Sequence, residues 1–303
     1  MKVVTSPSYA VDIGAHVFPT NKFALLRDRV EANGLVGPSD VVEPAPASWD
    51  DLALVHTPEY LRKLRTGLLS MGEIAQLELP WSAAIVEGFR MMTGGTIAAA
   101  RLALTEGVAV HLGGGLHHAY PDHGEGFCIF NDVAVAVRVL QRDGLVDRVA
   151  IVDCDVHHGN GTAAIFRDDA RVFTMSMHQE NNYPAIKPPS TLDIDLEDGI
   201  TDDDYLARLE AALPRVVAHR PEIVFFLAGA DPYEDDQLGG LGLTRQGLRA
   251  RDALVLAACR GAGLPVVVTL AGGYARHVDD TIAIHHATVE EAFAAANQGL
   301  PIP

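Results

Sequence analysis

Acidic and imidazole side chains alternate in the segment Ile151-Val-Asp-Cys-Asp-Val-His-His-Gly-Asn-Gly161. In an extended chain alternate side chains share one face, so Asp153, Asp155 and His157 project together. Three such groups at the end of an apolar strand are costly to bury unless something compensates their charge. A divalent cation does so, and the spacing therefore predicts a buried metal site.

A third ligand is expected from Asp231, which ends another apolar stretch in Leu227-Ala-Gly-Ala-Asp-Pro232. Asp155, His157 and Asp231 would form a three-ligand site that keeps a fourth position for water, as catalytic zinc sites do. Asp153 is then expected to lie outside the set of metal ligands and to orient them through hydrogen bonds.

One metal is expected rather than two. Gly159 and Tyr233 stand where a two-metal centre would need further carboxylates.

The segment Gly113-Gly-Gly-Leu-His-His118 places two adjacent histidines after a glycine turn. A divalent metal lowers the pKa of its water to about 7, so a modest base suffices to activate that water. Of His117 and His118, one can take a proton from the water and the other can donate to a leaving nitrogen. Tyr274, in Leu270-Ala-Gly-Gly-Tyr274, can donate a hydrogen bond to the developing oxyanion. This set of groups predicts amide hydrolysis.

Aromatic side chains are candidates for the walls of a narrow channel. Phe127 lies nine residues after His118 and directly after Gly126. Tyr183 lies in a proline-containing stretch, where an ordinary loop aromatic is an equally good interpretation.

The elements that position these residues alternate between short apolar runs and long helical patterns, which predicts an α/β fold with a largely parallel sheet. The expected strands are Val3–Ser6, Val108–Leu112, Val149–Val152, Val172–Ser176, Ile223–Leu227 and Val266–Leu270. The expected helices are Asn21–Asn33, Pro58–Thr66, Ala83–Thr105, Asp132–Asp143, Asp202–His219, Arg245–Ala262 and Asp279–Ala296. A long irregular loop is expected over His178–Asp198. We expect a single domain over residues 1–303.

The candidate residues follow four different strands. Because ligands of open parallel sheets bind outside the carboxyl ends of the strands, the four polar clusters are expected to meet at one edge.

Composition narrows the class of protein. The net charge of −17 opposes binding to nucleic acid, which needs Lys and Arg against phosphate. The three cysteines form no C-x-x-C pair, and the N-terminus has no long apolar run, so we expect a cytoplasmic protein without disulfides or a signal peptide. No apolar run is long enough to span a bilayer.

Taken together, the motifs resemble the zinc-dependent histone deacetylase superfamily over nearly the whole chain. The motifs that carry the resemblance are Gly-Gly-Gly-Leu-His117-His118, Gly126-Phe127-Cys128, Asp153-x-Asp155-x-His157-His158-Gly-Asn160-Gly, Ala-Gly-Ala-Asp231 and Gly-Gly-Tyr274. The segments that most resemble the class IV branch are Ser6-Pro7-x-Tyr9, Val55-His56-Thr57-Pro58-x-Tyr60, Thr93-Gly-Gly-Thr96 and Asp236-Gln-Leu-Gly-Gly-Leu241.

The resemblance implies an arginase/deacetylase fold, a mostly parallel eight-stranded sheet between helical layers. It implies hydrolysis of N-acyl-lysine in proteins or peptides, with zinc or ferrous iron on Asp155, His157 and Asp231. His117 and His118 would move protons, Tyr274 would polarise the carbonyl, and Gly126, Phe127 and Tyr183 would line the substrate channel. The implied structural potassium ligands are Asp153, Ser176, Met177 and the backbones of Asp155 and His157.

Asn160 departs from many class I members, which carry Asp at this position. An amide stabilises an imidazolium less than a carboxylate does, so His118 is expected to be the less basic histidine. The class IV resemblance raises the hypothesis that long fatty acyl groups are removed better than acetyl. The alternatives are an acetylpolyamine or other small-molecule amidohydrolase, and a metal-binding scaffold without activity. The oligomeric state is left open.

Overall fold

The fold is built around one sheet of eight strands, and the computed structural model describes residues 1–298. The strands are β1 Lys2–Val4, β2 Val41–Val42, β3 Val108–His111, β4 Val149–Asp153, β5 Val172–Gln179, β6 Leu192–Leu196, β7 Ile223–Leu227 and β8 Val266–Thr269. Their order is β2-β1-β3-β8-β7-β4-β5-β6, and each neighbouring pair is parallel. The predicted α/β class with a parallel sheet is confirmed.

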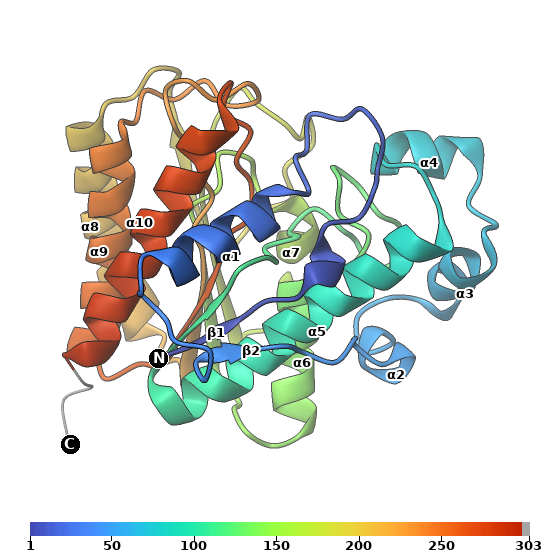
Figure 1. Cartoon of the computed structure of the whole chain (residues 1–303), viewed down its shortest axis with the longest axis horizontal. Coiled ribbons are helices and arrows are strands. Elements are labelled where there is room, and N and C mark those ends of the chain that lie inside the picture. The colour runs from blue at the N-terminus through green and yellow to red at the C-terminus, as the bar shows by residue number, and fades with distance from the viewer. Residues whose placement is uncertain (299–303) are drawn as a thin grey trace.

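Helices cover both faces of this sheet (Figure 1). They are α1 Lys22–Ala32, α2 Trp49–Leu52, α3 Pro58–Thr66, α4 Met71–Leu77, α5 Ala83–Glu106, α6 Asp132–Arg142, α7 Asn160–Phe166, α8 Asp202–Ala218, α9 Arg245–Gly261 and α10 Val278–Asn297, with a short 3₁₀ turn at Pro7–Tyr9. Figure 1 shows α8, α9 and α10 side by side, with α5 and α6 on the other side of the strands. None of the helices within residues 1–298 is both long and apolar enough to cross a membrane.

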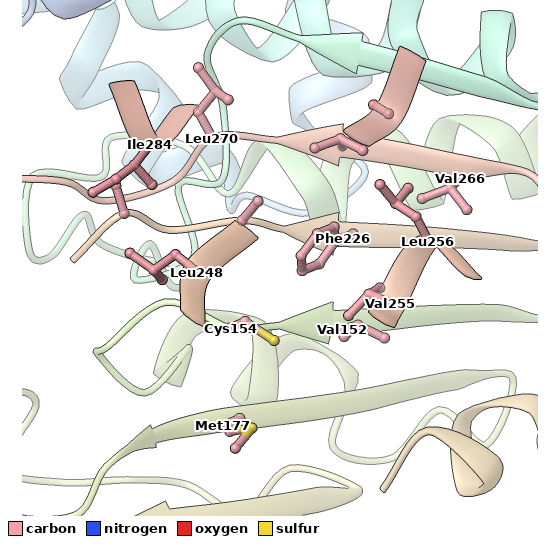
Figure 2. Close-up of a cluster of buried hydrophobic side chains, with 14 of the residues drawn as sticks. Val152, Cys154, Met177, Phe226, Leu248, Val255, Leu256, Val266, Leu270 and Ile284 are labelled. Atoms are coloured by element: carbon pink, nitrogen blue, oxygen red, sulfur yellow. The ribbon is translucent and has the colours of Figure 1, made fainter. Parts of the chain in front are cut away.

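Alternate side chains of a strand point to opposite faces of the sheet, so each strand contributes to the core on both sides, against both helical layers. In β7, Phe226 packs in the cluster that contains Leu248 of α9 and Ile284 of α10, as Figure 2 shows. Its neighbour Phe225 packs in the opposite cluster, with Val137 of α6. Since both faces of the sheet are buried at its centre, a central strand such as β7 is apolar throughout rather than alternating.

The expectation of an irregular loop over His178–Asp198 is wrong in part. The strand β5 continues to Gln179, and Leu192–Leu196 forms the edge strand β6. Leu192-Asp-Ile-Asp-Leu196 alternates apolar and acidic residues, and its two aspartates are exposed. The prolines of the preceding stretch favour a loop, and the alternation that marks this strand begins only after them. The two-residue strand β2 and the short helices α2, α4 and α7 were also not predicted.

Helix α5 packs closely against the chain that leads into α2, and Gly94 permits the approach. A Cβ atom at Gly94 would lie 1.9 Å from the carbonyl oxygen of Ala45. Gly72 in α4 has no such neighbour, since the nearest atom to a Cβ there is 3.9 Å away.

We predict that Gly94→Ala lowers the free energy of unfolding by about 1–3 kcal/mol, because a backbone carbonyl must move to admit the methyl group. Gly72→Ala is the matched control and is expected to raise stability by up to about 1 kcal/mol through helix propensity. Urea unfolding at 25 °C measures both changes. Equal or greater stability of Gly94→Ala would contradict the close contact.

Candidate active site

The polar clusters predicted from the sequence follow four strands that are neighbours in the sheet, in the order β3-β8-β7-β4. All four run parallel, so the chain segments that follow them leave from the same edge. The histidine pair follows β3, Tyr274 follows β8, Asp231 follows β7, and Asp155 with His157 follows β4. The expected convergence of these segments is observed.

Asp155, His157 and Asp231 form a buried group whose ligand atoms all lie within 4.8 Å of one another. His157 Nδ1 lies 3.0 Å from Asp155 Oδ1 and 3.5 Å from Asp231 Oδ2. Ligands bound at about 2.0–2.1 Å in a tetrahedral site are roughly 3.3 Å apart, so the spacing suits one metal ion.

The negative charge of the two buried carboxylates in this group also favours a bound cation. Asp231 Oδ2 is buried and has no hydrogen-bond partner among the described residues. Burial, and next the negative charge of Asp155, raise the pKa of Asp231 to about 7. The backbone N–H of Gly272 donates to Asp155 Oδ2, and that of Val156 donates to Asp231 Oδ1, which fixes both carboxylates. The residues present therefore fit a divalent metal.

Arg251 of α9 holds the two ligand-bearing segments in place. This guanidinium is fully buried, and its Nη1 donates to the carbonyl oxygens of Gly229 and Cys154 at 2.6 and 3.3 Å. Asp252 Oδ1 accepts from Arg251 Nε at 2.9 Å and offsets the charge of the guanidinium. A single arginine thus joins the segment after β4 to the segment after β7.

The two histidines lie against each other, with Nε2 atoms 3.1 Å apart. His117 Nδ1 lies 2.6 Å from Asp153 Oδ2. Burial alone would lower the pKa of His117, but the Asp153 and Asp155 carboxylates raise it to about 9. Burial, and then the charges of His117 and His157, lower the pKa of His118 well below its usual value. His118 is the less basic member, in the predicted direction, but burial and the neighbouring histidines lower its pKa, while the hydrogen bond with Asn160 raises it.

Glu125 determines how Asn160 faces His118. Asn160 Nδ2 donates to Glu125 Oε1 at 2.7 Å, so the amide oxygen of Asn160 points the other way, 2.7 Å from His118 Nδ1. A carboxylate can only accept here, and the amide oxygen likewise only accepts. His118 must therefore carry its proton on Nδ1, which leaves a lone pair on Nε2.

The glycine turn before the histidines is held by Asp132, the first residue of α6. Its carboxylate accepts from the backbone N–H groups of Leu116 at 2.7 Å and Gly115 at 3.1 Å. Gly115 has a φ of +79°, and a Cβ there would lie 2.7 Å from the backbone of Ala271. Glycine is required at this position by both conformation and space.

Tyr274 is held through its backbone. Its N–H donates to Asp236 Oδ2 at 2.7 Å, and its carbonyl oxygen accepts from the Gln237 side chain at 2.9 Å. Burial, and next the charges of Asp231 and Asp155, raise the pKa of the Tyr274 hydroxyl well above its usual value. The hydroxyl therefore remains protonated and can donate a hydrogen bond.

A pocket of about 150 Å³ leads from the surface to these groups. Its lining residues are Glu78, His118, Gly126, Phe127, Asn182, Tyr183, Leu238, His157 and Tyr274. Tyr183 packs edge-on against His118, with ring centroids 5.0 Å apart, and its hydroxyl donates to Glu125 at 3.0 Å. The expected channel residues Gly126, Phe127 and Tyr183 all lie on this pocket.

A smaller pocket of about 30 Å³ shares several of these residues and lies deeper, among Asp155, Leu116 and Phe23. Lys22 stands behind it, buried, and donates to the carbonyl oxygen of Ala271 at 3.1 Å. Burial lowers the pKa of Lys22 to about 8. The inner space of about 30 Å³ has room for only a small group.

Asp153 and Ser176 of the expected potassium site are paired across β4 and β5, and Met177 is buried beside them. Asp153 Oδ1 accepts from the backbone N–H of Asp155 at 3.1 Å. Ser176 Oγ accepts from Gly159 N–H and contacts His178 Nδ1 at 3.1 Å.

Four residues at the site were missed in the sequence: Lys22, Glu125, Asp132 and Arg251. Asp236 was named only as the start of a segment that carries the resemblance, without a role at the site. Glu125 lies two residues before Phe127, and a charge so close to a candidate channel wall was a usable signal. The other three lie on the helices α1, α6 and α9, outside the motifs that carry the ligands. Nothing local marks such residues as part of the site.

A family model described as "Histone deacetylase domain" matches residues 16–289. The chain is 43% identical to an uncharacterized protein of Picosynechococcus over 93% of this chain and 95% of that protein. It is 32% identical to Histone deacetylase 2 of Arabidopsis thaliana, over 93% of this chain and 78% of that protein.

Among solved structures, a histone deacetylase homologue complexed with SAHA superposes with a TM-score of 0.81 and 25% identity, covering 97% of this chain and 84% of the other. The sequence resemblance to the superfamily and the arginase/deacetylase fold are thereby confirmed. The chain belongs to the histone deacetylase family.

Proposed function

We propose that the protein is a zinc-dependent hydrolase that removes a short acyl group from the ε-amine of lysine in a protein or peptide. The observation that carries this proposal is the buried group of Asp155, His157 and Asp231 beside a histidine pair at the base of a narrow aromatic pocket. We further propose that residues 1–303 form one catalytic domain, which the family match over residues 16–289 supports.

The proposed metal ligands are Asp155, His157 and Asp231, a mixed oxygen and nitrogen set that suits Zn²⁺ and also Fe²⁺. When bound, the metal would act as a Lewis acid that polarises the scissile carbonyl and acidifies a water molecule. The proposed structural potassium would lie at Asp153, Ser176, Met177 and the backbones of Asp155 and His157. The pairing of Asp153 with Ser176 supports this placement.

The histidine pair divides the proton transfers. His118 is neutral and keeps its lone pair on Nε2, so it can accept a proton from the attacking water. His117 is held protonated by Asp153 and can donate a proton to the leaving lysine amine. The opposite directions of the two pKa shifts support giving the roles of base and acid to different members of the pair.

Tyr274 is the proposed donor to the oxyanion. Its hydroxyl stays protonated at neutral pH, and its backbone is fixed on both sides by Asp236 and Gln237. A donor that is already in place loses no energy to reorganisation when charge develops on the carbonyl oxygen.

The pocket supports a substrate with a long aliphatic stem and a small terminal group. Phe127 and Tyr183 line the outer part, which suits the methylene chain of lysine. The inner space of about 30 Å³ favours acetyl over a fatty acyl chain. This observation weighs against the fatty-acyl preference raised by the class IV resemblance.

Two other functions stay open to test. An acetylated polyamine has the same aliphatic stem and small acyl group, and the net charge of −17 would attract it. A scaffold without activity would have no use for a fixed Tyr274 and two histidines of opposite basicity.

We predict faster turnover of acetyl-lysine peptides than of myristoyl-lysine peptides or an acetylated polyamine, measured as kcat/KM after reconstitution with Zn²⁺. The same panel with Fe²⁺ identifies the better metal, and full chelation is expected to abolish turnover. Faster myristoyl turnover would overturn the short-acyl proposal, and faster polyamine turnover would favour the small-molecule alternative. No turnover of any substrate by metal-loaded protein would favour the scaffold.

We predict that Tyr274→Phe lowers kcat by about 100- to 1,000-fold, because the transition state loses one preformed donor. Zinc content should stay unchanged, since Tyr274 is not a proposed ligand. Tyr205→Phe removes a buried hydroxyl outside the pocket and is the control, with activity expected to remain. Loss of zinc from Tyr274→Phe would instead assign the tyrosine a structural role.

We predict that Glu125→Gln lowers kcat roughly 10-fold without loss of zinc, because Asn160 is then free to turn its amide group toward His118. Glu78→Gln removes a nearby negative charge on the same pocket and is the matched control. Equal losses in the two variants would mean that charge alone matters, and would contradict the proposed orientation of Asn160.

A further inference from the structure

A second group of potential metal ligands lies beside the active site, on the edge formed by β5 and β6. His158 directly follows the proposed ligand His157, His178 lies on β5, and Asp193 and Asp195 lie on β6. The ligand atoms of His158, His178 and Asp193 all lie within 4.8 Å of one another. The function proposed above does not use these residues.

Both imidazoles are buried and packed edge to face. His158 is 0% exposed and His178 is 1% exposed, and their ring centroids are 4.6 Å apart. Buried imidazoles normally find partners for both nitrogens. Here His178 Nε2 is buried without a hydrogen bond, although Asp195 Oδ1 lies only 3.1 Å from it.

The second nitrogen of His178 is held in the way that metal ligands require. Nδ1 lies 3.1 Å from Ser176 Oγ, and with the proton on Nδ1 the ring donates to this hydroxyl. The lone pair of Nε2 then points toward the carboxylates of β6. A ligating histidine commonly uses its other nitrogen in this manner, which fixes the orientation of the ring.

The spacing between the carboxylates and the imidazoles suits a metal as well. His158 Nε2 lies 3.2 Å from Asp193 Oδ1, and His178 Nε2 lies 3.1 Å from Asp195 Oδ1. Ligands of a tetrahedral ion at about 2.0–2.1 Å are separated by roughly 3.3 Å. In register, His178 is directly opposite Asp195, and Ser176 is opposite Asp193.

The aspartates of β6 have a simpler interpretation, as charges that protect an exposed edge strand from pairing with another chain. That role needs no histidine, and it leaves the buried Nε2 of His178 without a partner. Two neutral imidazoles and two carboxylates would together balance the charge of a divalent ion. Asp193 and Asp195 are exposed, so an ion has a path from solvent.

We propose that His158, His178 and Asp193, with Asp195 as fourth ligand, form a second transition-metal site, separate from the site of Asp155, His157 and Asp231. Two nitrogen donors favour Zn²⁺, Co²⁺ or Ni²⁺ over K⁺, Mg²⁺ or Ca²⁺, which prefer all-oxygen sites. An ion there joins the edge strand β6 to the segment that carries His157.

The test is a titration of the metal-free full chain with Co²⁺, read by elemental analysis after gel filtration and by visible absorption. Wild type is expected to bind two Co²⁺ per chain, and Asp193→Asn and His178→Gln one each. Asp231→Asn should also bind one, with a different absorption spectrum because the remaining ligands differ. Glu180→Gln, which removes an exposed acid at the end of β5, is the matched control and should keep two.

Binding of a single Co²⁺ by wild type at saturation, or of two by Asp193→Asn, would overturn the proposal. Asp193 is exposed, so this variant tests the site even where His178→Gln does not fold. The count of bound ions does not depend on catalysis. An inactive protein that binds two Co²⁺ would refute the proposed function alone.

Discussion

The structure depends on the cost of burying three carboxylates, Asp153, Asp155 and Asp231, at the ends of two neighbouring strands. A buried charge must be paired or hydrogen-bonded. Backbone N–H groups, His117 and His157 meet part of that requirement, and Asp231 Oδ2 is left without a hydrogen bond. The negative charge that is left uncompensated explains why a cation is expected to bind here. It also explains the opposite basicities of the histidine pair, because the carboxylates act more strongly on His117 than on His118.

Asn160 illustrates how a residue outside a motif can set the orientation of a residue inside it. The amide oxygen faces His118, and the amide N–H donates to Glu125, which places a carboxylate on the far side of the amide. The relay fixes which nitrogen of His118 carries the proton, but the negative charge now lies beyond the amide rather than against the ring. The tautomer is kept while the imidazolium is not stabilised, which suits a histidine that begins the reaction as a base.

The central part of the fold could be predicted because its signals are local. Strands buried on both faces are continuous apolar runs, and Asp-x-Asp-x-His places its ligands on one face by period two alone. Edge strand β6 was missed because it is half exposed and follows three prolines, so neither cue for a central strand applies. Arg251 and Asp132 were missed for another reason. Each acts on backbone carbonyl or N–H groups of distant segments, and a sequence does not show which backbone a helix will meet.

The four strand ends that build the site are neighbours in space but are spread from His117 to Tyr274 along the chain. Every contact among them is long-range, so no fragment that stops before β8 can assemble the pocket. In the sheet order β8 lies between β3 and β7, and it is the last strand along the described chain. The wall that carries Tyr274 therefore forms only after almost the whole chain has been translated, later than the pairing of β4 with β7 that brings Asp155 and Asp231 together.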